Sequence, residues 1–429
     1  MTGLTRRRAL ALAGAVATAG CGALSNGDDT TTLDGAALRE LVADGSPTVP
    51  ERIPVNISMT HFEATETRAR DLLDEVPANL GPDAIPNGAI RERVSHAREH
   101  AVEAVERAAN APSDYERLDG FADARPEARF AAASWRAIDD GLTRDDLHSD
   151  ATIVREDRQA LRERHEYLGA DPVTALVVHA AIERRLDTHI DTNRPRRYRP
   201  GNPLGVGELA EDIERARVAV DDAEHLYDRH VASLDDSPTL RSRYRAARET
   251  LRDDFESERA DLPSVDSERP WQVEGVDVSE TPAAEALEEL YRPLDPEYEL
   301  DWAEGSLARS LVRAHRAVVD LRAFESLRAR VADGERFAIE SVDDVSAIRS
   351  EALRAVQSAN ADPSVPVLTR SILADETDRL AGVDAELADA DDEERATSLR
   401  YPVSTYLTVM ARARELPSAS EHVASTLRT

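Results

Sequence analysis

The sequence predicts an all-α protein, an antiparallel helical array in two helical halves joined by a short irregular or β-hairpin connector. Apolar residues recur with helical periodicity from about residue 58 onward, and several helix starts carry a capping residue before a proline, as in Asp171-Pro172 and Ser237-Pro238. Such starts fit short loops between neighbouring antiparallel helices. The expected helices of the first half are 58–76, 86–109, 113–123, 127–140, 151–168, 172–191, 207–234 and 238–261.

The segment before residue 58 is expected to hold one helix and then an extended stretch. A period-two apolar pattern interrupted by prolines favours extended backbone there, on Val49, Ile53, Val55 and Ile57. Residues 33–261 are therefore predicted to form an N-terminal helical domain.

Residues 262–299 are rich in proline and acidic residues and break the helical pattern, so they are interpreted as a connector. A small hairpin is expected within them, on Trp271, Val273, Val276 and Val278. The C-terminal helical domain, 300–429, is expected to contain helices near 303–333, 342–359, 364–388 and 392–416. Pro402 lies inside the last of these, where it predicts a kink or a restart.

The composition is strongly acidic. The chain has 84 Asp and Glu against 53 basic residues, all of them Arg, and a formal net charge of −31. Such a surface repels itself unless salt screens it, which is typical of haloarchaeal proteins. The same charge argues against nucleic acid as a partner, because it would repel a phosphate backbone.

The first 21 residues carry the strongest functional signal. Arg6, Arg7 and Arg8 precede an apolar run from Ala9 to Gly20 that is too short to span a bilayer. This segment resembles a twin-arginine export signal, and the sequence Thr18-Ala19-Gly20-Cys21 that ends it resembles a lipobox. Arg6 and Arg7 would direct export, and Cys21, the chain's single cysteine, would receive the lipid.

The resemblance to haloarchaeal twin-arginine-exported lipoproteins covers residues 1–21 only. It implies a signal peptide at 1–20 and a lipid-anchored protein on the outer face of the cytoplasmic membrane, with residues 21–32 as a flexible tether. The alternative is an ordinary cleaved signal, in which case the protein is secreted.

Signatures of the common catalytic folds are missing from the sequence. It has no nucleotide-binding glycine loop, serine-nucleophile elbow, zincin motif or EF-hand loop. We therefore predict no catalytic residues and no cofactor, and leave a metal ion as the one alternative.

That alternative depends on the helix 172–191, whose first half is apolar on nearly all sides and is expected to be central. His179 and Glu183 lie one turn apart on its apolar stripe, a spacing that suits two metal ligands or a base and its orienting group. His315 lies on the apolar stripe of helix 303–333 and would complete the site if the two helices pack together. The competing interpretation is that these buried groups satisfy each other or an arginine.

A second candidate site is a basic loop in an otherwise acidic chain. It contains Arg194, Arg196, Arg197 and Arg199 and leads through a glycine-rich stretch into a helix start. Anionic lipid headgroups, a phosphate-bearing ligand or an acidic surface partner would suit it. These arginines would otherwise pair with the protein's own carboxylates.

These observations favour a lipid-anchored binding, interaction or structural module at the cell surface rather than an enzyme. The alternative function is an extracytoplasmic metal-binding protein or metal-dependent hydrolase that uses His179, Glu183 and His315.

Overall fold

The computed structural model describes residues 31–190, 197–199, 201–235, 237–260, 262, 269, 272–273, 276–295 and 304–429. Within these ranges the chain forms thirteen α-helices and one two-stranded antiparallel sheet, which confirms the predicted all-α class. The predicted signal and tether residues Arg6, Arg7 and Cys21 lie outside the described residues, as do Arg194 and Arg196.

The N-terminal lobe is built around α4, which packs on three other helices of the lobe. Large buried side chains fill the space between them, among them Phe62, Phe121 and Phe130. The helices of this lobe are α2 (Met59–Asp74), α3 (Gly88–Ala109), α4 (Asp114–Asp139), α5 (His148–Arg164) and α7 (Pro203–Ala232).

The C-terminal lobe is built around α13, which packs on each of α8 to α12. Its core includes Phe324, Tyr406 and Leu416. The helices of this lobe are α1 (Gly35–Leu41), α8 (Arg241–Ala260), α9 (Pro282–Tyr291), α10 (Leu307–Ala332), α11 (Val342–Ala361), α12 (Pro366–Ala388) and α13 (Arg400–Arg428).

A small sheet closes the free end of the C-terminal lobe. Strand β1 (Thr32–Asp34) pairs with β2 (Glu393–Arg395), and the chain enters α1 directly after it. A Cβ on Gly35 would lie 1.7 Å from the carbonyl oxygen of Asp391, so only glycine allows this approach. The sheet thereby joins the segment before α1 to the segment between α12 and α13.

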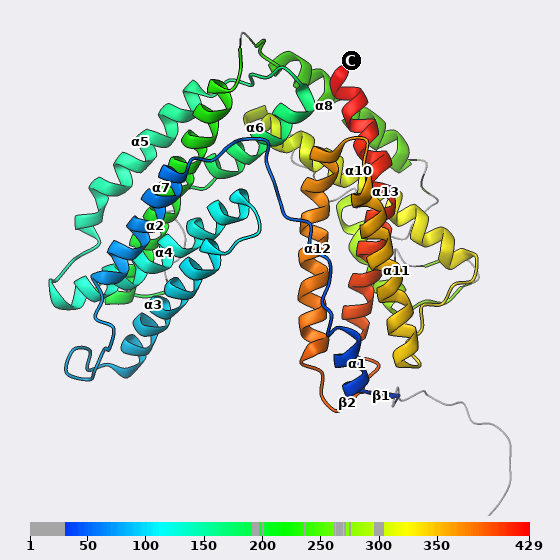
Figure 1. The fold of residues 1–429 in the computed structure, drawn as a ribbon, viewed down its shortest axis with the longest axis horizontal. Helices are drawn as coiled ribbons and strands as arrows, with labels where there is room; N and C mark the ends of the chain where they lie inside the picture. Colours follow the sequence, from blue (N-terminus) through cyan, green and yellow to red (C-terminus); the bar gives the residue numbers. More distant parts are fainter. Residues whose placement is uncertain are drawn as a thin grey trace, which may run out of the picture.

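Helix α6 (Pro172–Leu186) connects the lobes, because it packs on α7 of the first lobe and on α10, α12 and α13 of the second. Twelve of its fifteen residues are buried, which confirms the central position predicted for this helix. Figure 1 shows the two lobes meeting near α6 and diverging from it, so that the molecule has the shape of an arch with α6 at its apex.

Residues 45–57, which we call the strap, also connect the lobes. The strap leaves α1, passes along α12 and enters α2 (Figure 1). It is hydrogen-bonded to both sides: the Val49 amide donates to Thr377 Oγ1 of α12 at 3.2 Å, and the Glu51 amide donates to Glu116 Oε1 of α4 at 2.7 Å.

Several helix boundaries differ from the prediction. The expected helices 113–123 and 127–140 are one helix, α4, which continues through Pro126 because its packing on three neighbours outweighs the loss of one backbone hydrogen bond. The expected helix 392–416 begins only at Arg400, so of the kink or restart predicted at Pro402 the restart is found, and a proline in the first turn removes no intrahelical hydrogen bond. The helix continues through Pro417 to Arg428, past its expected end at 416.

The connector and the grouping of elements differ as well. Residues 282–291 of the predicted connector form α9, and the predicted hairpin is a single antiparallel bridge between Val273 and Val276, with Trp271 outside the described residues. Helices α1 and α8 were expected with the N-terminal domain by sequence order but pack in the C-terminal lobe. The predicted extended stretch at 49–57 lies within the strap and forms no strand.

No helix in the described part of the chain is both long and apolar enough to span a bilayer.

Candidate functional site

The predicted metal site is a buried hydrogen-bond network. His179 on α6 is fully buried, and its Nε2 lies 2.9 Å from the carbonyl oxygen of Leu168. His165 Nε2 lies 3.0 Å from His179 Nδ1, and His230 Nε2 lies 2.9 Å from the same Leu168 oxygen. A carbonyl only accepts, so His179 donates through Nε2 and accepts from His165 through Nδ1.

This arrangement keeps His165 and His179 neutral. Burial lowers the pKa of His179 to about 3, although the hydrogen bond to Leu168 opposes the shift, and burial together with the Arg241 charge lowers the pKa of His165 to about 4. Both nitrogens of His179 are occupied by these hydrogen bonds. The network holds the loop between α5 and α6, in which Leu168 also bridges Thr239.

The structure does not bring the three proposed metal ligands together. Glu183 accepts hydrogen bonds from the Tyr167 hydroxyl and, at 2.7 Å, from the Arg309 amide, so it joins α6 to the start of α10. His315 is on α10 as expected, but its Nε2 contacts Ser420 Oγ of α13 at 3.1 Å. Among the described residues no group of three or more His, Cys, Asp or Glu side chains is placed to hold a metal ion.

A cleft of about 310 Å³ lies where the two lobes meet. Four elements of the fold and the strap contribute to its walls: α4, α6, α10 and α12. The lining residues are Glu51, Ile53, Tyr115, Val177, Ala180, Ala181, Arg184, Arg309, Val312, Arg313, Arg316 and Ser371. The volume is at the lower end of the roughly 300–1,000 Å³ typical of small-molecule sites.

Two helices supply most of this lining with the same spacing. Helix α6 contributes residues 177, 180, 181 and 184, and α10 contributes 309, 312, 313 and 316. Residues at i, i+3, i+4 and i+7 lie on one face of a helix. Because α6 packs against α10, these two faces line one cleft.

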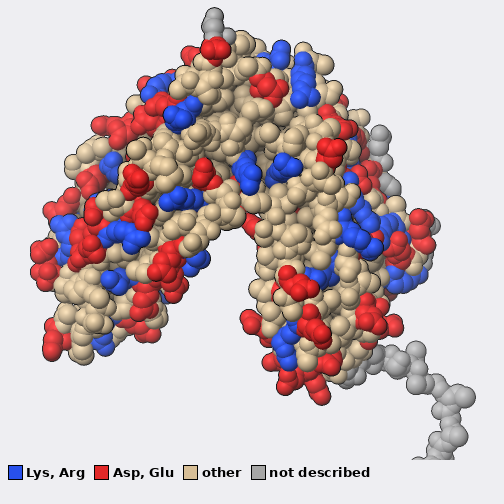
Figure 2. Space-filling model, in the orientation of Figure 1, with Lys and Arg blue, Asp and Glu red and all other residues tan. Residues whose placement is uncertain are grey.

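Four arginines in one small cleft are unusual in a chain with a net charge of −31. Figure 2 shows basic side chains gathered beneath the apex of the arch, whereas acidic side chains dominate the free ends of both lobes. Burial lowers the pKa of Arg309, and the positive charges of Arg313 and Arg184 lower it further. Glu183 opposes this shift, and an anion close to Arg309, Arg313 and Arg184 would offset the repulsion among them.

Carboxylates outside the lining hold some of these arginines in place. Arg184 Nη2 lies 2.8 Å from Asp119 Oδ2, Arg309 pairs with Asp187, and Arg316 pairs with Asp375. Arg184 Nη2 also donates to the Tyr115 hydroxyl at 2.5 Å. Each of these carboxylates is at least one-third exposed, so water and salt screen the pairs.

Glu51 is the one acidic residue in the lining, and its Oε1 lies 3.9 Å from Arg184 Nη1. Burial raises the pKa of Glu51 to about 7; Arg184 opposes this shift, and Asp119 and Asp375 add to it. Near neutral pH, Glu51 is thus partly protonated and offsets less of the arginine charge than an ordinary glutamate would.

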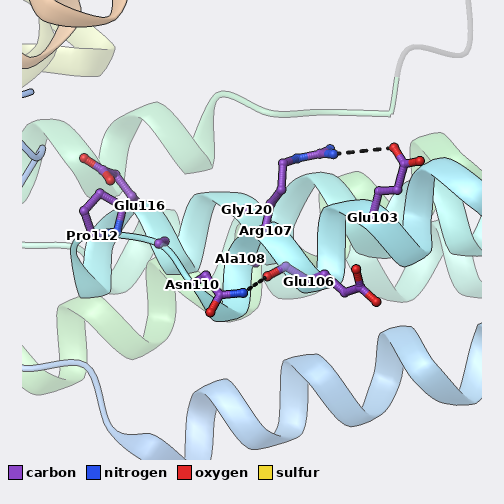
Figure 3. A pocket seen from close by; sticks show the side chains of 9 residues that line it. Glu103, Glu106, Arg107, Ala108, Asn110, Pro112, Glu116 and Gly120 are labelled. Carbon is purple, nitrogen blue, oxygen red and sulfur yellow. Dashed lines mark hydrogen bonds and ion pairs between the residues drawn. The ribbon is translucent and has the colours of Figure 1, made fainter. Parts of the chain in front are cut away.

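A wider concavity of about 670 Å³ lies where α3 ends and α4 begins (Figure 3). Its charged groups have mixed sign, and some of them interact with each other: Arg107 Nη1 lies 3.7 Å from Glu103 Oε2, and Asn110 Nδ2 donates to the Glu106 carbonyl at 2.8 Å. It therefore lacks the convergent polar groups of the interlobe cleft.

The predicted basic loop is described only in part. Arg197 and Arg199 are exposed, and the Arg197 guanidinium lies 5.7 Å from the centre of the Tyr198 ring. Tyr198 packs against the same hydrophobic cluster as Leu80 and Ala84, which follow α2 at the free end of the N-terminal lobe. This loop is separate from the interlobe cleft.

The lobes correspond closely to two family models. Residues 60–236 match a domain of unknown function (DUF8262), and residues 241–425 match a second domain of unknown function (DUF8264). The matches meet between α7 and α8, where the packing also changes from one lobe to the other.

No curated protein and no solved structure matches the chain significantly. The function must therefore be inferred from the geometry of the site.

Proposed function

We propose that this chain is a lipid-anchored extracytoplasmic binding protein whose ligand, an anion, occupies the cleft between the two helical lobes. The observation that carries the proposal is the cleft itself, where Arg184 of α6 faces Arg309, Arg313 and Arg316 of α10. Arginine is the side chain best suited to bind carboxylate and phosphate oxygens, because its donors form a planar fork.

The position of the cleft supports a binding role. Ligand sites commonly lie between domains, where a small relative movement of the two parts admits and encloses the ligand. Helix α6 packs on both lobes, and the strap is hydrogen-bonded to both lobes. A ligand that contacts Arg184 of α6 and Arg313 of α10 would therefore link this junction to the C-terminal lobe.

The proposed anchor fits the position of the first described strand. β1 lies at the free end of the C-terminal lobe (Figure 1), and the ten peptide units from Cys21 to Thr31 would reach at most about 35 Å. Arg197 and Arg199 lie at the free end of the other lobe, where headgroup contact would orient the arch. This arrangement would direct the opening of the arch toward the membrane.

The anchor is tested by replacing Cys21 with serine and fractionating the host cells. The wild-type protein is expected in the membrane fraction, and the Cys21→Ser protein in the soluble extracellular fraction. Retention of the variant on membranes would contradict the anchor.

Ligand binding is tested by negative-ion mass spectrometry of small molecules released from protein that was purified natively in molar salt. The wild-type protein and an Arg322→Gln control, changed on the same helix away from the cleft, are expected to release the same organic anion. The Arg184→Gln/Arg313→Gln protein is expected to release little of it. Equal amounts from all three proteins would refute the cleft as the site.

A further inference from the structure

We infer that the ligand is a small amphipathic organic anion, with its charged head at the arginines and its apolar body against the apolar side chains of the lining. This inference rests on the proposed function and adds the chemical class of the ligand. It follows from the presence of both arginines and apolar side chains in one cleft.

The apolar surface is continuous with the arginines. On α6, Val177, Ala180 and Ala181 precede Arg184 on the same face. On α10, Val312 lies between Arg309 and Arg313, and Ile53 of the strap completes the set. An inorganic anion would gain no binding free energy from such a surface, whereas a hydrocarbon chain would displace water from it.

The small alanine side chains leave room for that body. Ala180 and Ala181 lie between the larger Val177 and Arg184 in the sequence and add only one methyl group each to this wall. With a volume of about 310 Å³, the cleft suits a ligand smaller than the drug-sized molecules that occupy most pockets.

Salt supplies a further argument. The acidic composition indicates a protein that works in concentrated salt, where the Debye length falls to roughly 3 Å. Chloride then competes for the arginines, and a purely ionic ligand would be held weakly. Burial of apolar surface keeps its strength in salt, so an amphipathic anion combines a short-range ion pair with a contribution that salt does not screen.

The inference is tested by isothermal titration calorimetry of the ligand-free protein in molar KCl. A series from butanoate to octanoate keeps the head constant and lengthens the chain. We expect the affinity to rise roughly fourfold per methylene until the cleft is filled. Octan-1-ol and octylammonium keep the chain and change the head, and both are expected to bind at least tenfold more weakly than octanoate.

Two variants separate the head from the body. Arg313→Gln should weaken octanoate binding at least tenfold, whereas the Arg322→Gln control should bind it as the wild-type protein does. Ala180→Phe places a large side chain in the cleft, so the gain in affinity with chain length should disappear. Circular dichroism and the unfolding midpoint establish that each variant is folded.

The outcomes distinguish the two levels of the proposal. If short and long carboxylates bind equally tightly and Arg313→Gln weakens both, the cleft binds anions but the amphipathic class is wrong. If octan-1-ol or octylammonium binds as tightly as octanoate, the assignment of the head is wrong. If none of the probes binds and no anion is released from the native protein, both the inference and the proposed function fail.

Discussion

Glu51 gives the strap an unusual dependence on pH. Burial raises the pKa of this carboxyl from 4.5 to about 7 in the folded protein. Between these two values the folded state holds a proton that the unfolded state releases, so folding becomes less favourable as pH rises. The cost is absent below the unfolded pKa and complete above the folded one.

The size of the effect follows from the shift. The pKa is about 2.5 higher in the folded state, and each unit is worth about 1.36 kcal/mol. The carboxyl therefore lowers the free energy of unfolding by roughly 3 kcal/mol at pH 8, where it is ionised in both states, and by about 1 kcal/mol at pH 5, where the unfolded state has only begun to release its proton. The Glu51→Gln protein carries no such cost. It should therefore be more stable than the wild-type protein by about 3 kcal/mol at about pH 8, and by about 1 kcal/mol at about pH 5.

The assay is denaturant unfolding of both ligand-free proteins in molar KCl across this pH range. Glu116→Gln is a suitable control, because this carboxylate also contacts the strap but its side chain is less deeply buried. The difference in free energy of unfolding between the wild type and Glu116→Gln should change much less with pH. A constant difference between wild type and Glu51→Gln from about pH 5 to about pH 8 would refute the reasoning.

Three further predictions concern buried groups. Glu214→Gln should destabilise the protein by about 3 kcal/mol in denaturant unfolding, because it removes the buried carboxylate that lies 2.8 Å from Arg125 and 3.2 Å from Arg68 and leaves Arg125 only the more exposed Asp221; a loss below about 1 kcal/mol would contradict this. Burial acts to raise the pKa of Asp384, but hydrogen bonds from Arg349, Ser46 and Tyr406 lower it below its usual range, so the stability that this carboxylate contributes is present above the unfolded pKa and is lost as pH falls through the folded one. The free energy of unfolding of Asp384→Asn should thus fall less than that of the wild type as the pH is lowered into the acid range. If the two free energies fall in parallel with pH, this role of Asp384 is wrong. Elemental analysis should find no stoichiometric transition metal in the wild-type protein or in His179→Ala, and a metal lost specifically in the variant would restore the metal-site hypothesis.

Local sequence patterns predict most of the helices because capping residues and apolar periodicity act within one element. Asp171 caps α6 through the Thr174 amide at 2.8 Å, and the burial of His179 and Glu183 follows from the helical spacing. The same patterns fail where tertiary packing decides, as at Pro126 and in the placement of α8.

The contacts of the predicted site depend on side chains that are distant in sequence. The sequence hypothesis that helices 172–191 and 303–333 pack together is confirmed, since the Arg309 amide donates to Glu183. The sequence does not determine which turns of the two helices meet, and His315 lies at a turn that contacts α13 instead. His165 and His230 were not predicted as partners of His179. His165 reaches it from the end of α5, and His230 of α7 shares with it the carbonyl of Leu168, which lies in a loop.

The interlobe cleft had a signal in the sequence. Arg309, Arg313 and Arg316 follow the spacing of one helical face and surround the apolar Val312. Arginines on a helix more often form a solvated face, and only the packing of α10 on α6 makes this stripe the wall of a cleft. The sequence alone favours Arg194, Arg196, Arg197 and Arg199 instead, because they are nearly contiguous.

The most direct test of the account is a crystal structure of the protein purified from its own host in molar salt, without any step that removes bound small molecules. The account predicts electron density for an organic anion between Arg184 and Arg313, with its apolar part against Ala180 and Val312. Solvent alone in this cleft, together with an organic ligand bound elsewhere on the chain, would contradict it.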